Sequence, residues 1–168
     1  MIQKKERALK INKIREAWNN YFFTERPVDG ICILRILLGS LIFSTFLQDA
    51  IFYQDIWSTE AIQSLETSLK NYSFPILNIF QYFPDKNWVI ISAMITMFIS
   101  LFCFIFGFKT KTAAIISFIL LVSFNQRNIN MLSSADLLIR ILLMYFMFAP
   151  SGNKYSIDAI LARRKGKE

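Results

Sequence analysis

Histidine is missing from this chain of 168 residues, and cysteine occurs only twice. Histidine is the commonest general base and metal ligand in proteins, so its absence argues against the usual hydrolytic and zinc sites. Cys32 and Cys103 lie in different apolar runs and form no C-x-x-C motif. We therefore expect two packing residues, with a redox pair as the alternative. No glycine-rich phosphate loop is present, and we predict no metal site.

Glycine and proline are scarce as well, with five and four residues against 17 phenylalanines. The chain is 54% hydrophobic, and its mean hydropathy is +0.39. A soluble domain of this size cannot bury so much apolar surface, so the composition predicts an integral membrane protein. Residues 1–27 are mostly polar and carry no signal-peptide cleavage site, so we expect the first apolar run to act as an uncleaved anchor.

Four apolar runs predict an all-α, polytopic membrane protein, a four-helix transmembrane bundle that occupies residues 28–150. The predicted spans are about 28–47, 88–108, 113–130 and 132–148. Residues 48–87 form an acidic connection between the first two spans, and we interpret 72–83 as an interfacial or re-entrant stretch. Residues 151–168 form a basic tail.

The N-terminal segment 1–27 alternates apolar residues with lysine and arginine over 3–23. This pattern predicts an amphipathic helix that lies in the headgroup region of a bilayer. A solvated helix or a docking surface for a protein partner is the alternative. Such a partner would bind through residues 1–24 and 48–87.

The basic residues predict how the chain is oriented. Seven lysines and arginines precede residue 28, two lie in the 109–111 turn and five follow Pro150, whereas the other side holds three. The positive-inside rule then places both termini in the cytoplasm of a multi-pass protein of the cell (inner) membrane. The net charge of +7 flanks the apolar runs, so we expect contact with the bilayer and not with nucleic acid.

Charged residues inside the predicted spans are the strongest indication of function, because they are costly in a bilayer and usually serve a site. Arg35 and Arg140 lie at similar predicted depth, and Asp136 lies one helical turn from Arg140. Asp136 and Arg140 can form a self-neutralising pair. Alternatively, Asp136 neutralises one arginine while the other binds an anion, or Asp136 accepts a proton. Asn125, Arg127 and Asn128 either line the same pocket or form a polar loop.

Three motifs in order carry a resemblance to a family. They are Pro27-x(5)-Ile33-Leu34-Arg35-Ile36-x(2)-Gly39, then Asn125-Gln126-Arg127-Asn128 with Ser134-Ala135-Asp136-x(3)-Arg140, then Ala149-Pro150-Ser151-Gly152-x(2)-Tyr155-Ser156-Ile157-Asp158. Together they resemble the horizontally transferred transmembrane (HTTM) domain, which is similar to the membrane region of vitamin K-dependent gamma-carboxylase. The resemblance covers about residues 22–162 and matches the amino-terminal part of the family's membrane domain.

The resemblance implies a multi-helix membrane domain and, in the carboxylases, a site that oxidises reduced vitamin K, a quinol, and carboxylates glutamate. The family's Asn-His pair would fall near Asn125–Asn128, but this chain has no histidine. The family's catalytic lysine and large extracytoplasmic domain lie beyond the matched part. We therefore predict no cofactor and do not carry the carboxylase chemistry over; a quinone or reduced vitamin K as cofactor is implied by the resemblance alone. Eight residues are retained as family-like positions: Arg35, Asn125, Arg127, Asn128, Asp136, Arg140, Ser156 and Asp158.

We interpret the chain as an HTTM-type membrane protein with an intramembrane polar pocket formed by spans one, three and four. The pocket is predicted to bind a lipid or a small anionic ligand, and the chain to act as a subunit or truncated relative. Two alternatives remain open. One is a quinol-oxidising or carboxylating enzyme in which Asp136 is the only candidate base, and the other is a structural partner in a membrane complex.

Overall fold

The computed structural model describes residues 13, 18, 29–61, 64–71, 77–128, 132–152, 154–164 and 166. Every regular element in these ranges is a helix, which confirms the all-α class for them. The predicted amphipathic segment 1–27 lies outside the described residues except for residues 13 and 18. Residues 72–76 of the predicted interfacial stretch also lie outside them.

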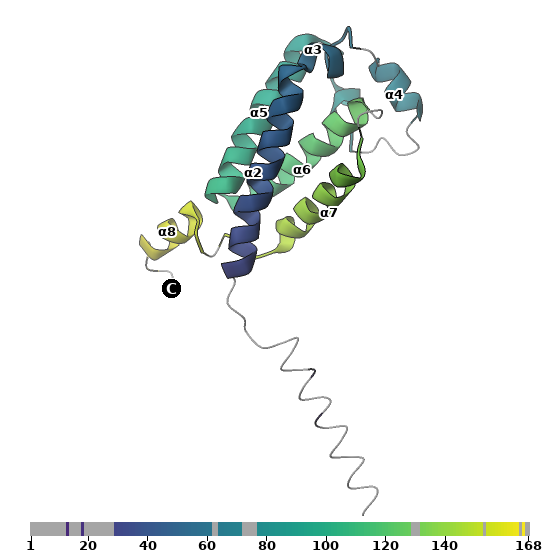
Figure 1. The fold of residues 1–168 in the computed structure, drawn as a ribbon. Coiled ribbons are helices and arrows are strands. Elements are labelled where there is room, and N and C mark those ends of the chain that lie inside the picture. Colours follow the sequence, from purple (N-terminus) through teal and green to yellow (C-terminus); the bar gives the residue numbers. More distant parts are fainter. Residues whose placement is uncertain are drawn as a thin grey trace, which may run out of the picture.

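Four helices are much longer than the others and lie side by side (Figure 1). They are α2 (Asp29–Ile51), α5 (Asn87–Phe106), α6 (Thr110–Arg127) and α7 (Ser134–Phe148). At one end, which we call the loop end, lie α3 (Tyr53–Ile56), α4 (Leu65–Asn71) and the 3-10 helix η1 (Ile79–Tyr82). At the opposite end, which we call the tail end, lie the start of α2, the turn between α5 and α6, and α8 (Ile157–Arg164).

The helices begin and end at residues that differ from the limits of the predicted apolar spans. α2 continues to Ile51, past the predicted end at residue 47, because helical hydrogen bonding does not require apolar side chains. α6 begins at Thr110, before the predicted start at residue 113, and ends at Arg127. α7 begins with a capping box in which the Ser133 hydroxyl accepts from the amide of Asp136, while Asp136 accepts from the amide of Ser133.

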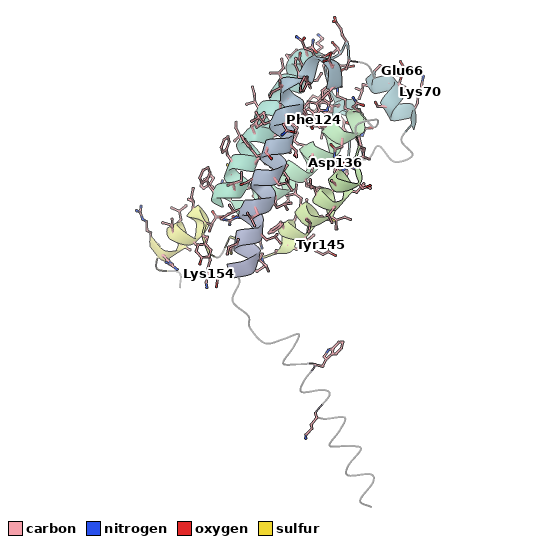
Figure 2. All side chains as sticks on the ribbon, viewed as in Figure 1. Glu66, Lys70, Phe124, Asp136, Tyr145 and Lys154 are labelled. Atoms are coloured by element: carbon pink, nitrogen blue, oxygen red, sulfur yellow. The ribbon has the colours of Figure 1, made fainter. Side chains whose placement is uncertain are left out.

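The interior is formed by apolar side chains that all four long helices contribute. α5 packs on α2 and on α6, and α6 packs on α7. Near the loop end, Phe124 is the centre of an aromatic cluster (Figure 2), with the ring centroids of Phe46, Trp57 and Phe80 at 5.1, 4.6 and 5.2 Å. Deeper between the helices, the hydroxyls of Ser100 and Ser117 lie 2.8 Å apart and join α5 to α6.

Two helices, α2 and α5, are long and apolar enough to cross a membrane. Only 33% of the most apolar window of each is buried, so most of the residues in each window are exposed or half-buried. At about 1.5 Å per residue, α2 and α5 span about 34 and 30 Å, which matches a hydrocarbon core of about 30 Å.

The thiols of Cys32 and Cys103 are both free, and Cys32 is fully buried in the packing.

Candidate functional site

Arg35 is fully buried at the tail end, where its guanidinium holds the chain that follows α7. Nη1 donates to the carbonyl of Ser151 at 2.5 Å, and Nη2 donates to the carbonyl of Tyr155 at 2.6 Å. A longer contact of 3.4 Å joins Nη2 to the carbonyl of Ile105 at the end of α5. Three separate segments therefore meet at one arginine, which satisfies carbonyl groups that burial would otherwise leave unpaired.

Asp158 caps the first turn of α6 from a distant part of the chain. Its carboxylate accepts from the amides of Lys109 and Thr110 at 2.8 and 2.9 Å, and from the Thr110 hydroxyl at 2.8 Å. Burial raises the pKa of this carboxyl, but these three hydrogen bonds and the nearby Arg35 charge outweigh burial. The net pKa of Asp158 therefore lies below its ordinary value. Asp158 is ionised at neutral pH and stabilises the positive end of the helix dipole.

Gly107 makes the approach between Arg35 and the last helix possible. It ends α5 in the left-handed region, with φ of +72°, and its carbonyl accepts from the amide of Asp158 at 3.0 Å. A Cβ at this position would conflict with Ser156 and lie 2.7 Å from Arg35 Nη1. The hydroxyl of Ser156 in turn accepts from the amide of Ala159 and so caps α8.

Arg127 has the matching role at the loop end, where it holds the connection 48–87 against α6. Nε donates to the carbonyl of Trp57 at 2.6 Å, and Nη2 forms an ion pair of 2.7 Å with Asp85. Its guanidinium also lies over the Phe80 ring, 5.3 Å from the centroid. The Arg127 side chain is 2% exposed, so this pair is desolvated on the arginine side.

Asn128 adds to this connection by donating to the carbonyl of Ile56 at 3.2 Å. The Ser68 hydroxyl on α4 reaches the carbonyl of Arg127 at 2.6 Å. The side-chain oxygen Oδ1 of Asn128 and the side-chain nitrogen Nδ2 of Asn78 are buried without hydrogen-bond partners. Arg127, the last residue of α6, and Asn128 therefore tie the connection to α6.

Arg140 faces α6 from the middle of α7. With the Asn125 amide oriented so that its oxygen faces Arg140, Nε and Nη2 lie 3.2 and 3.1 Å from that oxygen. Asp136 instead accepts from the amide and hydroxyl of Ser133, at 2.8 and 2.9 Å. Asp136 and Arg140 form no ion pair in the described residues. The ion pairs there join Lys70 to Glu66, Arg127 to Asp85, and Lys154 to Asp29.

The six predicted ligand-binding residues are therefore distributed over the molecule. Arg35 binds backbone at the tail end, whereas Arg127 and Asn128 bind backbone at the loop end. Asn125 and Arg140 form a separate pair, and Asp136 belongs to a helix cap toward the loop end (Figure 2). The structure does not bring Arg35 and Arg140 around one carboxylate, because the Arg35 guanidinium is directed to the segment after α7.

A cavity of about 600 Å³ opens at the tail end, and sequence reasoning did not assign its residues to a site. Lys109, Lys111 and Arg163 line it together with Asp158, so its rim carries three cations and one anion. Its other lining residues are Thr110, Thr112, Ala149, Pro150, Gly152, Ala159 and Ala162. The volume is typical of small-ligand sites, and the charge balance favours an anion. The signal in the sequence was the Lys109-Thr110-Lys111 turn, which had served only to orient the chain.

In the part of the chain that the structure describes, the fold is all-helical, two helices are long and apolar enough to cross a membrane, and a basic cavity lies at one helix end. No protein-family model, curated protein or solved structure matches the chain.

Proposed function

We propose that this chain is a multi-pass protein of the cell (inner) membrane, with α2, α5, α6 and α7 as its four spans. α2 and α5 supply the length and hydropathy, and large apolar side chains face outward along α6 and α7 as well. α6 and α7, with 18 and 15 residues, are about 27 and 22 Å long. A bilayer adapts to short helices by local thinning, which costs little per ångström.

Both termini lie on the cytoplasmic side in this proposal. Lys109, Lys111 and Arg163 gather around one cavity at the tail end, and Lys154 pairs with Asp29 at the start of α2. At the loop end, Lys70 is paired with Glu66 on α4 (Figure 2). The tail end therefore carries more lysine and arginine than the loop end, and the positive-inside rule places the more basic end in the cytoplasm.

Within the membrane, the chain binds an anionic lipid or small anionic ligand and serves as a subunit and not as a complete enzyme. The observation that carries this proposal is the pair of exposed lysines, Lys109 and Lys111, at the rim of the 600 Å³ cavity, where the carboxylate of Asp158 already accepts hydrogen bonds from the first turn of α6. The geometry of Asp136, the candidate base of the enzyme alternative, gives that alternative no support, because its carboxylate accepts both of its described hydrogen bonds within a helix cap. Membership of the HTTM family is part of the same proposal. Its first and last motifs supply Arg35 and Asp158, which each join separate segments of the chain at the tail end, and this shared location supports the proposal.

Two measurements test the proposal. After Cys32→Ser and Cys103→Ser, single Lys70→Cys and Lys154→Cys variants are treated in intact cells with a membrane-impermeant maleimide. We expect labelling at position 70 and none at position 154, and the reverse pattern would contradict the topology. For binding, the wild-type chain is purified from membranes and its retained lipids are identified by native mass spectrometry. Retention without preference for anionic lipid would contradict the function.

A further inference from the structure

An apolar groove on the outer face of α5 and α6 adjoins the basic cavity. The groove has a volume of about 170 Å³, and Ile99, Phe108 and Ile116 form part of its walls. Lys109 and Thr112 line both the groove and the cavity, so the two spaces meet at these residues. A continuous surface thus changes from cationic to apolar over the first turn of α6.

The cavity holds more positive charge than its own carboxylate neutralises. Asp158 is already engaged with the amides of Lys109 and Thr110 and with the Thr110 hydroxyl. The ammonium groups of Lys109 and Lys111 belong to exposed side chains on the same rim. Ser151, between the lining residues Pro150 and Gly152, has a buried hydroxyl without a hydrogen-bond partner.

The neighbouring helix α8 has the composition of an interfacial helix. Ile157, Ile160 and Leu161 are exposed on it, and Arg163 and Arg164 occupy its last turn. Figure 1 shows α8 beside the lower end of α5, projecting away from the long helices. A short helix with exposed isoleucines and terminal arginines is suited to the boundary between headgroups and acyl chains.

We infer that the cavity and the groove form one binding site for an anionic phospholipid. The phosphate lies in the cavity against Lys109 and Lys111, and one acyl chain lies in the groove against Ile99 and Ile116. This inference rests on the proposed function, in which the tail end meets the cytoplasmic leaflet. A cationic cavity alone would fit any small anion. A cavity that adjoins an apolar groove fits an amphiphile, whose charged head and apolar chain can occupy the two spaces together.

The test compares two double variants that remove the same charge from opposite ends. Lys109→Gln with Lys111→Gln changes the cavity, and Lys70→Gln with Lys86→Gln changes the loop end. The purified chains are titrated in neutral detergent with phosphatidylglycerol or phosphatidylcholine of the same acyl chains. Bound lipid is counted by native mass spectrometry. Circular dichroism before titration establishes that each variant is folded.

We expect the wild type to retain phosphatidylglycerol over phosphatidylcholine, the cavity variant to bind it about tenfold or more weakly, and the loop-end variant to bind it as the wild type does. Equal weakening in both variants would overturn the site and leave the proposed function intact. A wild type without preference between the two lipids would overturn both.

Two further measurements address the groove. Ile116→Trp fills it and leaves every cation in place, so it should weaken phosphatidylglycerol binding as well. Unchanged binding in Ile116→Trp would remove the groove from the site. Glycerol 3-phosphate, which carries the head but no chain, should compete poorly with the lipid. Competition equal to that of the lipid would mean that the cavity binds a small anion without an acyl chain.

Discussion

Replacing Gly107 with alanine tests whether the tail end depends on the close approach of Arg35 to the chain after α7. Gly107 has φ of +72°, and an L-residue in the left-handed region costs about 1–2 kcal/mol. The new Cβ would also conflict with Ser156 and lie 2.7 Å from Arg35 Nη1. Forcing an extra carbon into a packed site costs about 1–3 kcal/mol, so we expect a loss of about 2–5 kcal/mol in the free energy of unfolding.

Gly30→Ala is the matched control, because a Cβ at Gly30 would meet nothing within 4 Å. Gly30 is the second residue of α2, where alanine is favoured over glycine by up to about 1 kcal/mol, so this variant should be as stable as the wild type or more stable. Both chains are unfolded by titrating SDS into mixed micelles and followed by tryptophan fluorescence. A difference of less than about 1 kcal/mol between them would refute the reasoning, since the left-handed backbone alone should exceed it.

Three further predictions use the same unfolding assay. Arg127→Leu should lower stability by about 2 kcal/mol or more, because it leaves the carbonyls of the buried residues Trp57 and Ser58 without this donor, while water can solvate the exposed carboxylate of Asp85. Lys70→Leu, which breaks an exposed pair, should cost about 0.5 kcal/mol or less. The pKa of Asp158 is lower in the folded chain than in the unfolded one, so its contribution is complete above the unfolded pKa of about 3.9 and is lost as the pH falls through the folded pKa. The stability difference between wild type and Asp158→Asn should therefore be constant near neutral pH and shrink as the pH falls below about 4. Ser117→Ala removes a buried hydrogen bond between α5 and α6 and should cost about 1 kcal/mol.

Each of these has an outcome that contradicts it. Equal losses for Arg127→Leu and Lys70→Leu would mean that the connection 48–87 is not held through Arg127. A pH-independent difference for Asp158→Asn would mean that the carboxylate charge does not stabilise α6. An unaltered Ser117→Ala chain would mean that packing alone joins α5 to α6.

Hydropathy predicted where the long helices lie but not where they begin and end. α5 differs from its predicted span by one residue at the start and two at the end, because apolar residues fill it almost completely. α6 starts three residues earlier than expected, since its first turn is capped by Asp158, which lies 48 residues away along the chain. A cap supplied from so far away leaves no local pattern that sequence reasoning can detect.

For the charged residues as well, the sequence shows where they lie along the chain but not which groups they contact. The sequence shows Arg35 as an unusual residue in an apolar run, but its partners are the backbone carbonyls of Ser151 and Tyr155, more than 100 residues away. Spacing of four residues suggested that Asp136 pairs with Arg140. In the structure the carboxylate of Asp136 caps its own helix, and Arg140 lies beside Asn125.

The sequence by itself determined the helical class, the apolar runs and the unequal charge of the two ends, because these depend on composition and on the 3.6-residue period. Only the tertiary structure decided which carbonyls Arg35 and Arg127 satisfy, and that Lys109, Lys111 and Arg163 share one cavity. The physical reason is that a buried polar group takes whichever partner the packing brings within about 3 Å. That partner is chosen by the folding of distant segments onto one another and not by neighbours along the chain.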